Sequence, residues 1–351
     1  MTVLAGNPAF MALTSAALFG LATPFAKLFL DGIQAWLLAG LLYLGAGIGL
    51  GLFILLRRAG GHGPRETPLA RADLPWLAGA IGAGGLAAPV LLMFGLNMTS
   101  ASSGSLLLNL EAIATIGIAA LIFREHAGLR LLLGAGLILA GAVALSWHGD
   151  FFTLDYGAIL ISAACIAWGI DNNLTRRISG ADPVQITMLR GLIAGVVNVS
   201  IGSAGGATLP EPVILAGALL TGFLGYGVSL VLFVMSLQRL GTSRTGAYFA
   251  TAPFIGALAA IPLLSDPVTP QFLIAGALMG LGVWLSLTEH HQHIHAHEAL
   301  EHSHRHSHDA HHHHTHRDDA SENESHTHPH RHEPLTHSHP HWPDLHHRHG
   351  H

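Results

Sequence analysis

Half of the 351 residues are hydrophobic, only 11% are charged, and 42 are glycine. This composition is too apolar for a water-soluble domain and indicates an integral membrane protein. The net charge of -5 is unevenly distributed, because residues 288–351 hold ten of the 21 acidic residues and four of the 16 basic ones. Cys165 is the single cysteine, so an internal disulfide is excluded. It lies in an apolar run.

Ten apolar stretches are each long enough, at roughly 20 residues, to cross a hydrocarbon core about 30 Å thick as a helix. They are 9–30, 33–56, 74–96, 101–123, 129–147, 156–175, 184–204, 213–237, 245–264 and 270–287. The first has no cation before it and continues into further spans, so we expect it to stay rather than be cleaved as a secretory signal. The predicted fold class is an all-α integral membrane protein with ten transmembrane helices.

Arginines mark one side of the predicted membrane. The loops that follow even-numbered spans contain Arg57, Arg124, Arg176 and Arg239 with neighbouring arginines, whereas the opposite loops contain acidic residues and no Lys or Arg. Because cytoplasmic loops are enriched in Lys and Arg, we predict a multi-pass protein of the inner (plasma) membrane. Both termini would then be cytoplasmic.

The chain contains an internal repeat. Phe19-Gly20 returns as Trp168-Gly169, Gly40-Leu41 as Gly191-Leu192, and Arg124-Glu125 as Ser265-Asp266. Such self-similarity indicates duplication, with helices 1–5 in residues 1–150, helices 6–10 in 151–287, and a separate tail in 288–351. Five helices is an odd number, so the two copies are inverted in the membrane. Inverted repeats are a recurrent transporter architecture with the substrate site near the midplane.

Short motifs in both halves add a family resemblance. Over residues 9–287 the chain resembles the EamA-type permeases of the drug/metabolite transporter superfamily, through the stretches 94–102, 106–111, 123–125 and 139–141. The resemblance implies a ten-helix secondary transporter, often an exporter of small metabolites. The Glu-Pro pair of that family is divided here, because Glu111 precedes Ala112 in the first half and Ala252 precedes Pro253 in the second.

Glu111 is the most deeply placed acid of the predicted spans, about halfway along 101–123. Ionisable residues inside a membrane are costly and normally face a water-filled cavity or a partner. Desolvation there favours the neutral acid, so this carboxyl would be able to exchange a proton for a substrate cation or amine. A purely structural role, a protonated acid bonded to a neighbouring helix, is an equally good interpretation.

Asp171 and Arg190 should lie at a similar depth on two successive helices. An ion pair between those helices is favoured over substrate binding, because pairing is the least costly way to hold both charges there. We add Asn109, Asn172 and Asn173 to the candidate substrate path.

Thr23 and Pro24 occupy the positions in the first half that Asn172 and Asn173 occupy in the second, and they complete the candidate path with Pro253. The two prolines lack a backbone donor and are predicted to kink helices 1 and 9. Amides in membranes also serve as ordinary interhelical hydrogen-bond partners, which remains the simpler role for any one of them.

The tail has a different chemistry. Residues 288–351 contain 25 of the 28 histidines and almost no aliphatic residues, which predicts disorder without metal. The candidate metal ligands are His302, His304, His306, His308, His311, His312, His313, His314, His337, His339, His341, His346, His347 and His349. Neutral imidazole binds Zn, Ni, Co and Cu. The histidines are interspersed with Asp, Glu, Ser and Pro, which favours a native metal-binding segment over an affinity tag.

Three functions fit these observations. The first is a metabolite exporter with a cytosolic metal-binding tail that acts as a buffer or sensor, and the second is a transporter of Ni, Co or Zn fed by the tail. The third is a membrane-anchored metal store without transport. No enzyme motif or nucleic-acid patch is present, and we expect no required cofactor, with a divalent transition metal on the tail as an option. The expected partners are the lipid bilayer and a small-molecule or metal substrate, and proton coupling and a homodimer are options that the sequence leaves open.

Overall fold

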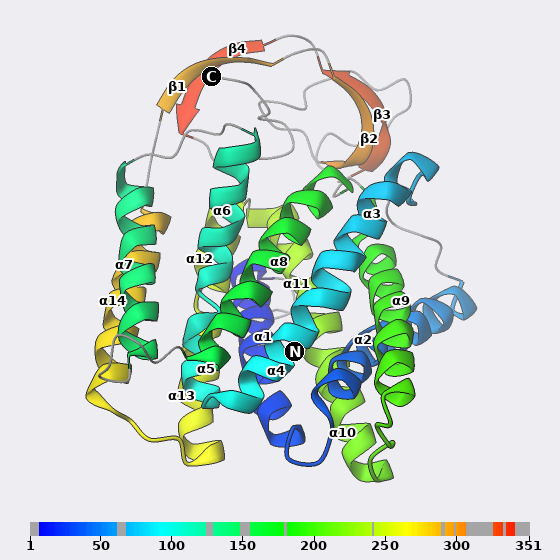
Figure 1. Ribbon diagram of the computed structural model, residues 1–351. Helices are drawn as coiled ribbons and strands as arrows, with labels where there is room; N and C mark the ends of the chain where they lie inside the picture. The colour runs from blue at the N-terminus through cyan, green and yellow to red at the C-terminus, as the bar shows by residue number, and fades with distance from the viewer. Residues whose placement is uncertain are drawn as a thin grey trace.

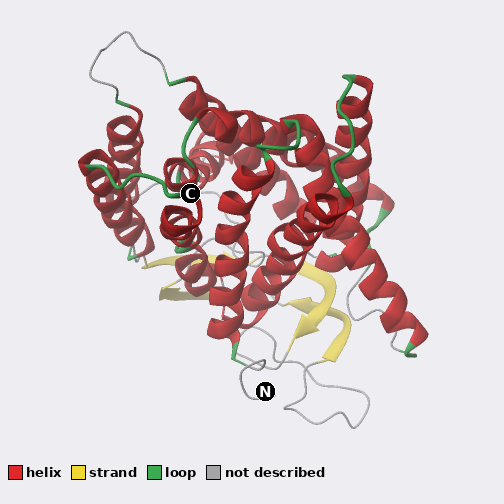
Figure 2. Cartoon of the chain, turned by 90° about the horizontal axis from the view of Figure 1, so that it is seen from below, coloured by secondary structure: helices red, strands yellow, loops and turns green. Residues whose placement is uncertain are grey.

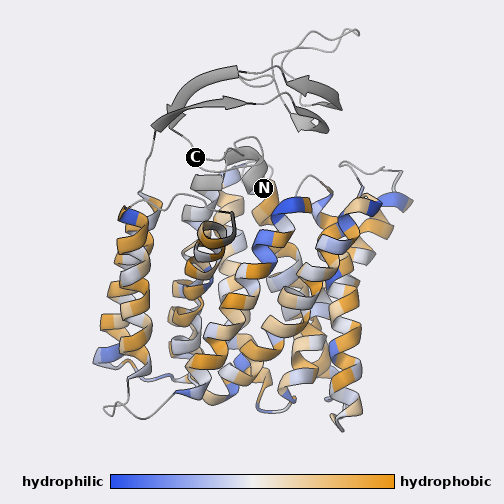
Figure 3. Ribbon diagram, turned by 45° about the horizontal axis from the view of Figure 1, so that its top comes forward, coloured by the Kyte–Doolittle hydropathy of each residue, from blue (hydrophilic) through white to orange (hydrophobic). Residues whose placement is uncertain are grey.

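The computed structural model describes residues 7–61, 68–123, 129–147, 155–178, 181–240, 242–288, 292–297, 300–306, 326–332 and 335–340. Its helices pack side by side in one bundle, and the strands lie outside that bundle (Figure 1, Figure 2). Hydrophobic residues cover most of the bundle's length, and hydrophilic residues gather near its ends (Figure 3). We call the end where α14 stops the tail face and the opposite end the far face.

The first half contains the elements up to residue 146. They are α1 (Pro8–Phe29), α2 (Ala35–Ala59), η2 (Arg71–Asp73), α3 (Leu74–Ala80), η3 (Ile81–Ala87), α4 (Ala88–Met98), α5 (Ala101–Leu107), α6 (Leu110–Phe123) and α7 (Leu129–Ser146). Here η2 is a 3-10 turn and η3 is a π-helical segment. Elements η2 to α4 form one continuous span, Arg71–Met98.

The second half repeats this order. Its elements are α8 (Tyr156–Ile178), α9 (Pro183–Ala204), α10 (Pro212–Gly222), η4 (Phe223–Val228), α11 (Ser229–Leu240), α12 (Thr242–Phe249), α13 (Ala252–Leu264) and α14 (Pro270–Leu287). Nine described helical segments are long and apolar enough to cross a membrane. Nine of the ten predicted spans therefore have a counterpart of membrane-spanning length, and the fold class is confirmed.

The predicted span 245–264 is not one helix. It is divided into α12 and α13 by turn residues 250–251, and Pro253 stands in the first turn of α13 rather than in the middle of a kinked helix. The predicted span 101–123 is likewise divided at residues 108–109, between α5 and α6. Proline inside α1, at position 24, leaves that helix unbroken.

The two halves share these irregularities at equivalent positions. An offset of 141 residues aligns Glu125 with Asp266 and brings the break at 108–109 within one residue of the break at 250–251. The same offset lays η3 over η4, so both third helices contain a π-helical segment at matching places. Broken helices near the midplane are typical of transporter binding sites, and π segments often mark functional sites.

Glycines allow the closest helix contacts. At Gly20 an added methyl group would collide with the backbone carbonyl of Ala252, which fixes α1 directly against α13. Gly47 and Gly191 bring α2 and α9 together backbone to backbone in the same way, and Gly134 does so for α7 against α14. Small residues give such close approach in membrane helices, as the glycine-rich composition predicts.

On the far face, two polar contacts tie the halves and helices together. The Asp266 carboxylate accepts a hydrogen bond from the Ser102 backbone N–H, at 2.8 Å, and so caps the first turn of α5 from the other half. The Lys27 ammonium donates to the Leu96 carbonyl at 2.6 Å, near the end of α4. Lysine favours a helix C-terminus because the unpaired carbonyls there are partly negative.

Four strands occupy part of the tail. β1 (Gln292–His297) pairs antiparallel with β4 (Leu335–Pro340), and β2 (Leu300–His306) pairs antiparallel with β3 (His326–His332). That the tail is disordered without metal stays a prediction. The alternation of histidine with other residues matches the two-residue period of a strand, which makes an extended backbone compatible with this sequence.

Candidate functional site

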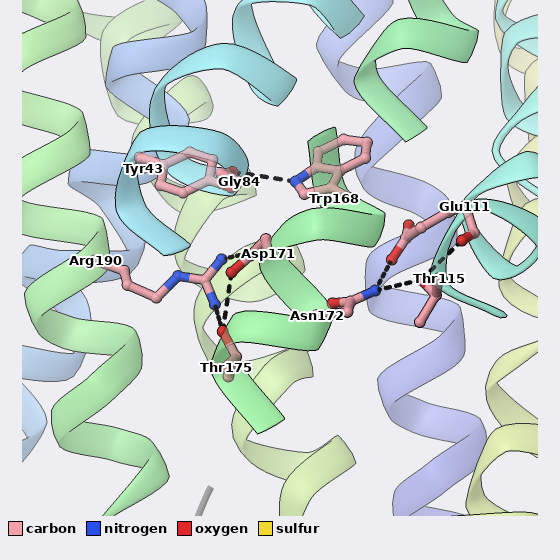
Figure 4. A network of polar contacts seen from close by, with 9 residues as sticks. All are labelled: Tyr43, Gly84, Glu111, Thr115, Trp168, Asp171, Asn172, Thr175 and Arg190. Carbon is pink, nitrogen blue, oxygen red and sulfur yellow. Dashed lines mark hydrogen bonds and ion pairs between the residues drawn. The ribbon is translucent and has the colours of Figure 1, made fainter. Parts of the chain in front are cut away.

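Glu111 lies in the first turn of α6, directly after the break that follows α5. Its side chain is partly exposed, and one carboxylate oxygen accepts a hydrogen bond from Asn172 Nδ2 at 2.9 Å. The same amide nitrogen lies 3.1 Å from the hydroxyl oxygen of Thr115, one helical turn after Glu111 (Figure 4). The site is thus built across α6 and α8, which pack against each other.

Asn173 holds this helix contact together from its buried side. Its amide nitrogen donates to the Thr115 carbonyl at 3.1 Å and to the Gly169 carbonyl at 2.8 Å. Gly169 leaves no room for a side chain, because an added methyl group would meet the backbone of Ala114 at 2.9 Å. The second aromatic-Gly pair of the repeat is therefore the close-approach point of α8 and α6.

Asp171 and Arg190 form an ion pair between α8 and α9. The other Asp171 oxygen accepts from the Thr175 hydroxyl at 2.9 Å, and Arg190 Nη1 lies 3.4 Å from the same hydroxyl. The two charged side chains expose only 3% and 11% of their surface. Burial makes pairing essential, because either charge alone would be uncompensated in an apolar interior.

Above this pair, the carbonyl of Gly84 in η3 accepts two side-chain hydrogen bonds. Tyr43 Oη donates at 2.5 Å and Trp168 Nε1 at 3.1 Å (Figure 4). The next carbonyl, that of Gly85, accepts from Asn198 Nδ2 at 3.1 Å. The polar network therefore continues from α8 into the π-helical segment.

The structure brings together some predicted path residues and leaves others apart. Asn109 is buried at the α5–α6 break, and its amide nitrogen donates to the Leu106 carbonyl at 2.8 Å. Thr23 and Pro24 are buried in α1, which packs on α11 and α13, and Figure 4 contains neither of them. Their place on one substrate path with Asn172 stays a prediction.

Several residues of the network were missed by the sequence reasoning. Thr115 and Thr175 each stand four residues after a singled-out acid, and this spacing places them on the same helix face. This four-residue spacing could have predicted both threonines from the sequence. Tyr43 offered no comparable signal, because its partner is a backbone carbonyl exposed by a π-helical segment.

The predicted metal ligands are placed only in part. His302, His304 and His306 belong to β2, and His337 and His339 belong to β4. The backbone register sets His302 opposite His330 and His339 opposite His293. The remaining predicted ligands lie outside the described residues: His308, His311, His312, His313, His314, His341, His346, His347 and His349.

Comparison with known proteins identifies the family. The model of the EamA-like transporter family matches residues 7–147 and again residues 155–288. The chain belongs to the EamA-like transporter family. The two matches coincide with the two halves of the bundle, so the internal repeat is a repeat of the EamA unit.

Relatives of this EamA protein are named as transporters. An uncharacterized transporter of Methanothermobacter thermautotrophicus is 30% identical over 78% of this chain and 84% of its own length. A probable terminal-alkyne amino-acid exporter of Streptantibioticus cattleyicolor is 26% identical over 65% and 77%. The uncharacterized inner membrane transporter YedA of Escherichia coli K12 is 25% identical over 74% and 85%.

A solved crystal structure has the same fold. Its TM-score is 0.60 at 17% sequence identity, and the match covers 80% of this chain and 95% of the other. At this identity the likeness concerns the arrangement of the helices alone. Family membership thus rests on the sequence matches, and the fold comparison agrees with it.

Proposed function

We propose that this EamA protein is a secondary exporter of small amine-bearing metabolites that uses Glu111 as its proton and substrate site. The supporting observation is the placement of Glu111: a partly exposed carboxylate at a helix break that accepts a hydrogen bond from Asn172, whose amide also donates to Thr115. Acids within spans are costly and usually serve a transport pathway. Broken helices at membrane depth are tolerated where they are buried in protein or line a water-filled cavity.

One carboxylate can bind either a proton or an ammonium group, and binding of one lowers its affinity for the other. Loss of a proton from Glu111 leaves a negative charge that attracts the amine, and protonation releases the amine. Exclusive binding of the two ligands at one site couples their opposite movement. This supports proton exchange against an amine as the transport cycle.

The substrate class follows from the same groups. A carboxylate complements an ammonium ion, while an amide and a hydroxyl complement other polar substrate groups. The printed name of one relative, an amino-acid exporter, agrees with an amine-bearing substrate. Amino acids and small primary amines are therefore the first substrates to assay.

The orientation and the tail complete the proposal. Arginine-rich ends of α2 and α8 lie on the tail face, which supports a cytoplasmic tail face and cytoplasmic termini. The tail then binds Ni, Zn, Co or Cu in the cytosol as a buffer or sensor. Among the described residues no three His, Cys, Asp or Glu side chains gather to hold a metal, so a metal path through the bundle lacks support.

Reconstitution in vesicles tests the proposal. Full-length protein and a chain ending at residue 288 would be assayed for amino-acid, amine and Ni or Zn flux under an imposed pH gradient. The key variant is Glu111→Gln, and the matched control is Glu211→Gln, because Glu211 precedes α10 without a side-chain capping bond.

We expect proton-driven amine flux in both chains, lost in Glu111→Gln and retained in Glu211→Gln. Metal flux that requires the tail would establish the metal transporter instead. Absence of any flux would overturn both transport functions and leave the membrane-anchored metal store.

A further inference from the structure

The π-helical segment η3 supports the polar site with backbone rather than side-chain groups. A π turn interrupts the regular α-helical hydrogen-bond pattern, so carbonyl groups become accessible to other donors. The Gly84 carbonyl takes one hydrogen bond from α2, through Tyr43, and one from α8, through Trp168. Three elements therefore meet at one backbone oxygen.

The same glycine touches the ion pair. A methyl group added at Gly84 would overlap the carboxylate of Asp171, so this backbone position and the acid are in direct contact. Trp168 precedes Asp171 by three residues and Asn172 by four on the same helix. The indole bond to Gly84 therefore sets both the rotation and the height of α8 where it presents the acid and the amide.

The other half of the protein shows that the fold itself does not need these contacts. The repeat places Phe19, which has no polar hydrogen, where Trp168 stands, and Ala194 where Tyr43 stands. At the positions equivalent to Asp171 and Arg190 it places Ala22 and Ala39. The second π segment, η4, forms without any of these four polar groups. The side chains that donate to the Gly84 carbonyl, Tyr43 and Trp168, therefore occur together with the polar site, and a π-helical segment can form without them.

We propose that Tyr43 and Trp168 are positioning residues of the transport site. Through the Gly84 carbonyl they fix α8 so that Asp171 meets Arg190 and Asn172 reaches Glu111. Neither residue touches the substrate in this scheme. The inference rests on the proposed function for its transport measurement, and a second measurement is independent of transport.

The two donors share one acceptor, which predicts non-additive effects. Removing either donor leaves the Gly84 carbonyl with the other, whereas removing both leaves a buried carbonyl with no side-chain donor. Each of Tyr43→Phe and Trp168→Phe should raise the KM for the amine about threefold, from the net value of one hydrogen bond. The double variant should raise it more than about 30-fold.

The control is Tyr226→Phe. This tyrosine belongs to η4, and its ring centroid lies 5.6 Å from that of Tyr43, so the variant removes a neighbouring hydroxyl of the same chemistry. It should transport like the unmodified protein. A purely structural role for Tyr43 and Trp168 would instead lower the amount of folded protein and the maximal rate while leaving KM unchanged.

The sole cysteine reports the position of α8 directly. Cys165 is fully buried three residues before Trp168, and its sulfur lies 3.7 Å from the Leu107 carbonyl. Displacement of α8 should expose it, so maleimide should modify the double variant at least about tenfold faster than either single variant. Purified full-length protein without substrate is sufficient for this measurement.

The outcomes separate the two proposals. The positioning role would be overturned if the KM increases of the two single variants simply multiplied in the double variant, or if Tyr226→Phe raised KM as much as Tyr43→Phe does. Unchanged labelling of Cys165 in the double variant would also overturn it. If no amine is carried, the proposed function fails while the labelling experiment still decides the role of Tyr43 and Trp168.

If the double variant does not accumulate, a double-mutant cycle between Trp168 and Asn172 takes its place. Trp168 acts through Asn172, so the KM effect of Trp168→Phe should vanish in an Asn172→Ala background. Persistence of that effect would contradict the inference.

Discussion

Asp171 on α8 and Arg190 on α9 share a buried ion pair that neither helix could hold alone. Removing one partner leaves an uncompensated charge, which costs about 3–5 kcal/mol in the free energy of unfolding. We predict that Asp171→Asn and Arg190→Gln each lower the melting temperature in detergent strongly. Melting followed by size-exclusion chromatography measures this.

The double variant Asp171→Leu with Arg190→Met provides the control. Replacing both charges with apolar groups should recover most of the lost stability, because no charge remains to be compensated. Transport should not recover, since Asn172 would lose the framework that aims it at Glu111. Single variants as stable as the unmodified protein would contradict the structural importance of the pair.

The pair also shows what the sequence could predict. The apolar stretches, their internal repeat and the proximity of Asp171 to Arg190 follow from composition, spacing and charge, because a charge in a membrane requires a partner. Nine spans appear where predicted, and their lengths are set by membrane thickness.

The helix breaks and π segments were beyond such reasoning. Residues 108–109 are Leu-Asn and residues 250–251 are Ala-Thr. Neither pair contains the glycine or proline that predicts a turn. Gly84 and Gly85 belong to a glycine-rich run that indicates close packing equally well in any helix type. Their carbonyls find partners on α2, α8 and α9, and such tertiary contacts leave no local pattern.

Thr115 tests whether the hydroxyl beside Glu111 contributes to binding. Thr115→Val keeps the shape but removes the oxygen that lies 3.1 Å from Asn172 Nδ2. We expect the KM for the amine to rise about threefold to tenfold, the range of one net hydrogen bond. Vesicle flux at several substrate concentrations provides the value.

Thr14→Val is the matched control, because both threonines also donate to the carbonyl four residues earlier, at 2.8 Å. Thr14 lies near the start of α1, where it makes no contact with the network of Figure 4. Equal KM changes in the two variants would show that the effect arises from the helix rather than from the site.

Gly20 tests the close packing of the first helix. Gly20→Ala forces a methyl group against the carbonyl of Ala252, so α1 and α13 must separate. Overpacking of this kind costs about 1–3 kcal/mol in the free energy of unfolding. Gly136→Ala, on an exposed part of α7 with no atom within 4 Å of the added methyl, should melt like the unmodified protein. The idea fails if both variants melt at the same temperature.

The tail predicts metal binding that can be separated from transport. Removing residues 289–351 takes away all 25 tail histidines and leaves His62, His126 and His148 in the chain. Equilibrium dialysis with Ni or Zn should therefore find several bound ions per full-length chain and almost none on the shortened one. Binding to the full chain should be strong above about pH 6.5 and decline below it, because a protonated imidazole has no lone pair for the metal.

Amine flux at fixed pH should be the same in both chains when metal is absent. If the shortened chain binds as much metal as the full one, the ligands lie in the bundle, and a metal path through the membrane would have to be reconsidered.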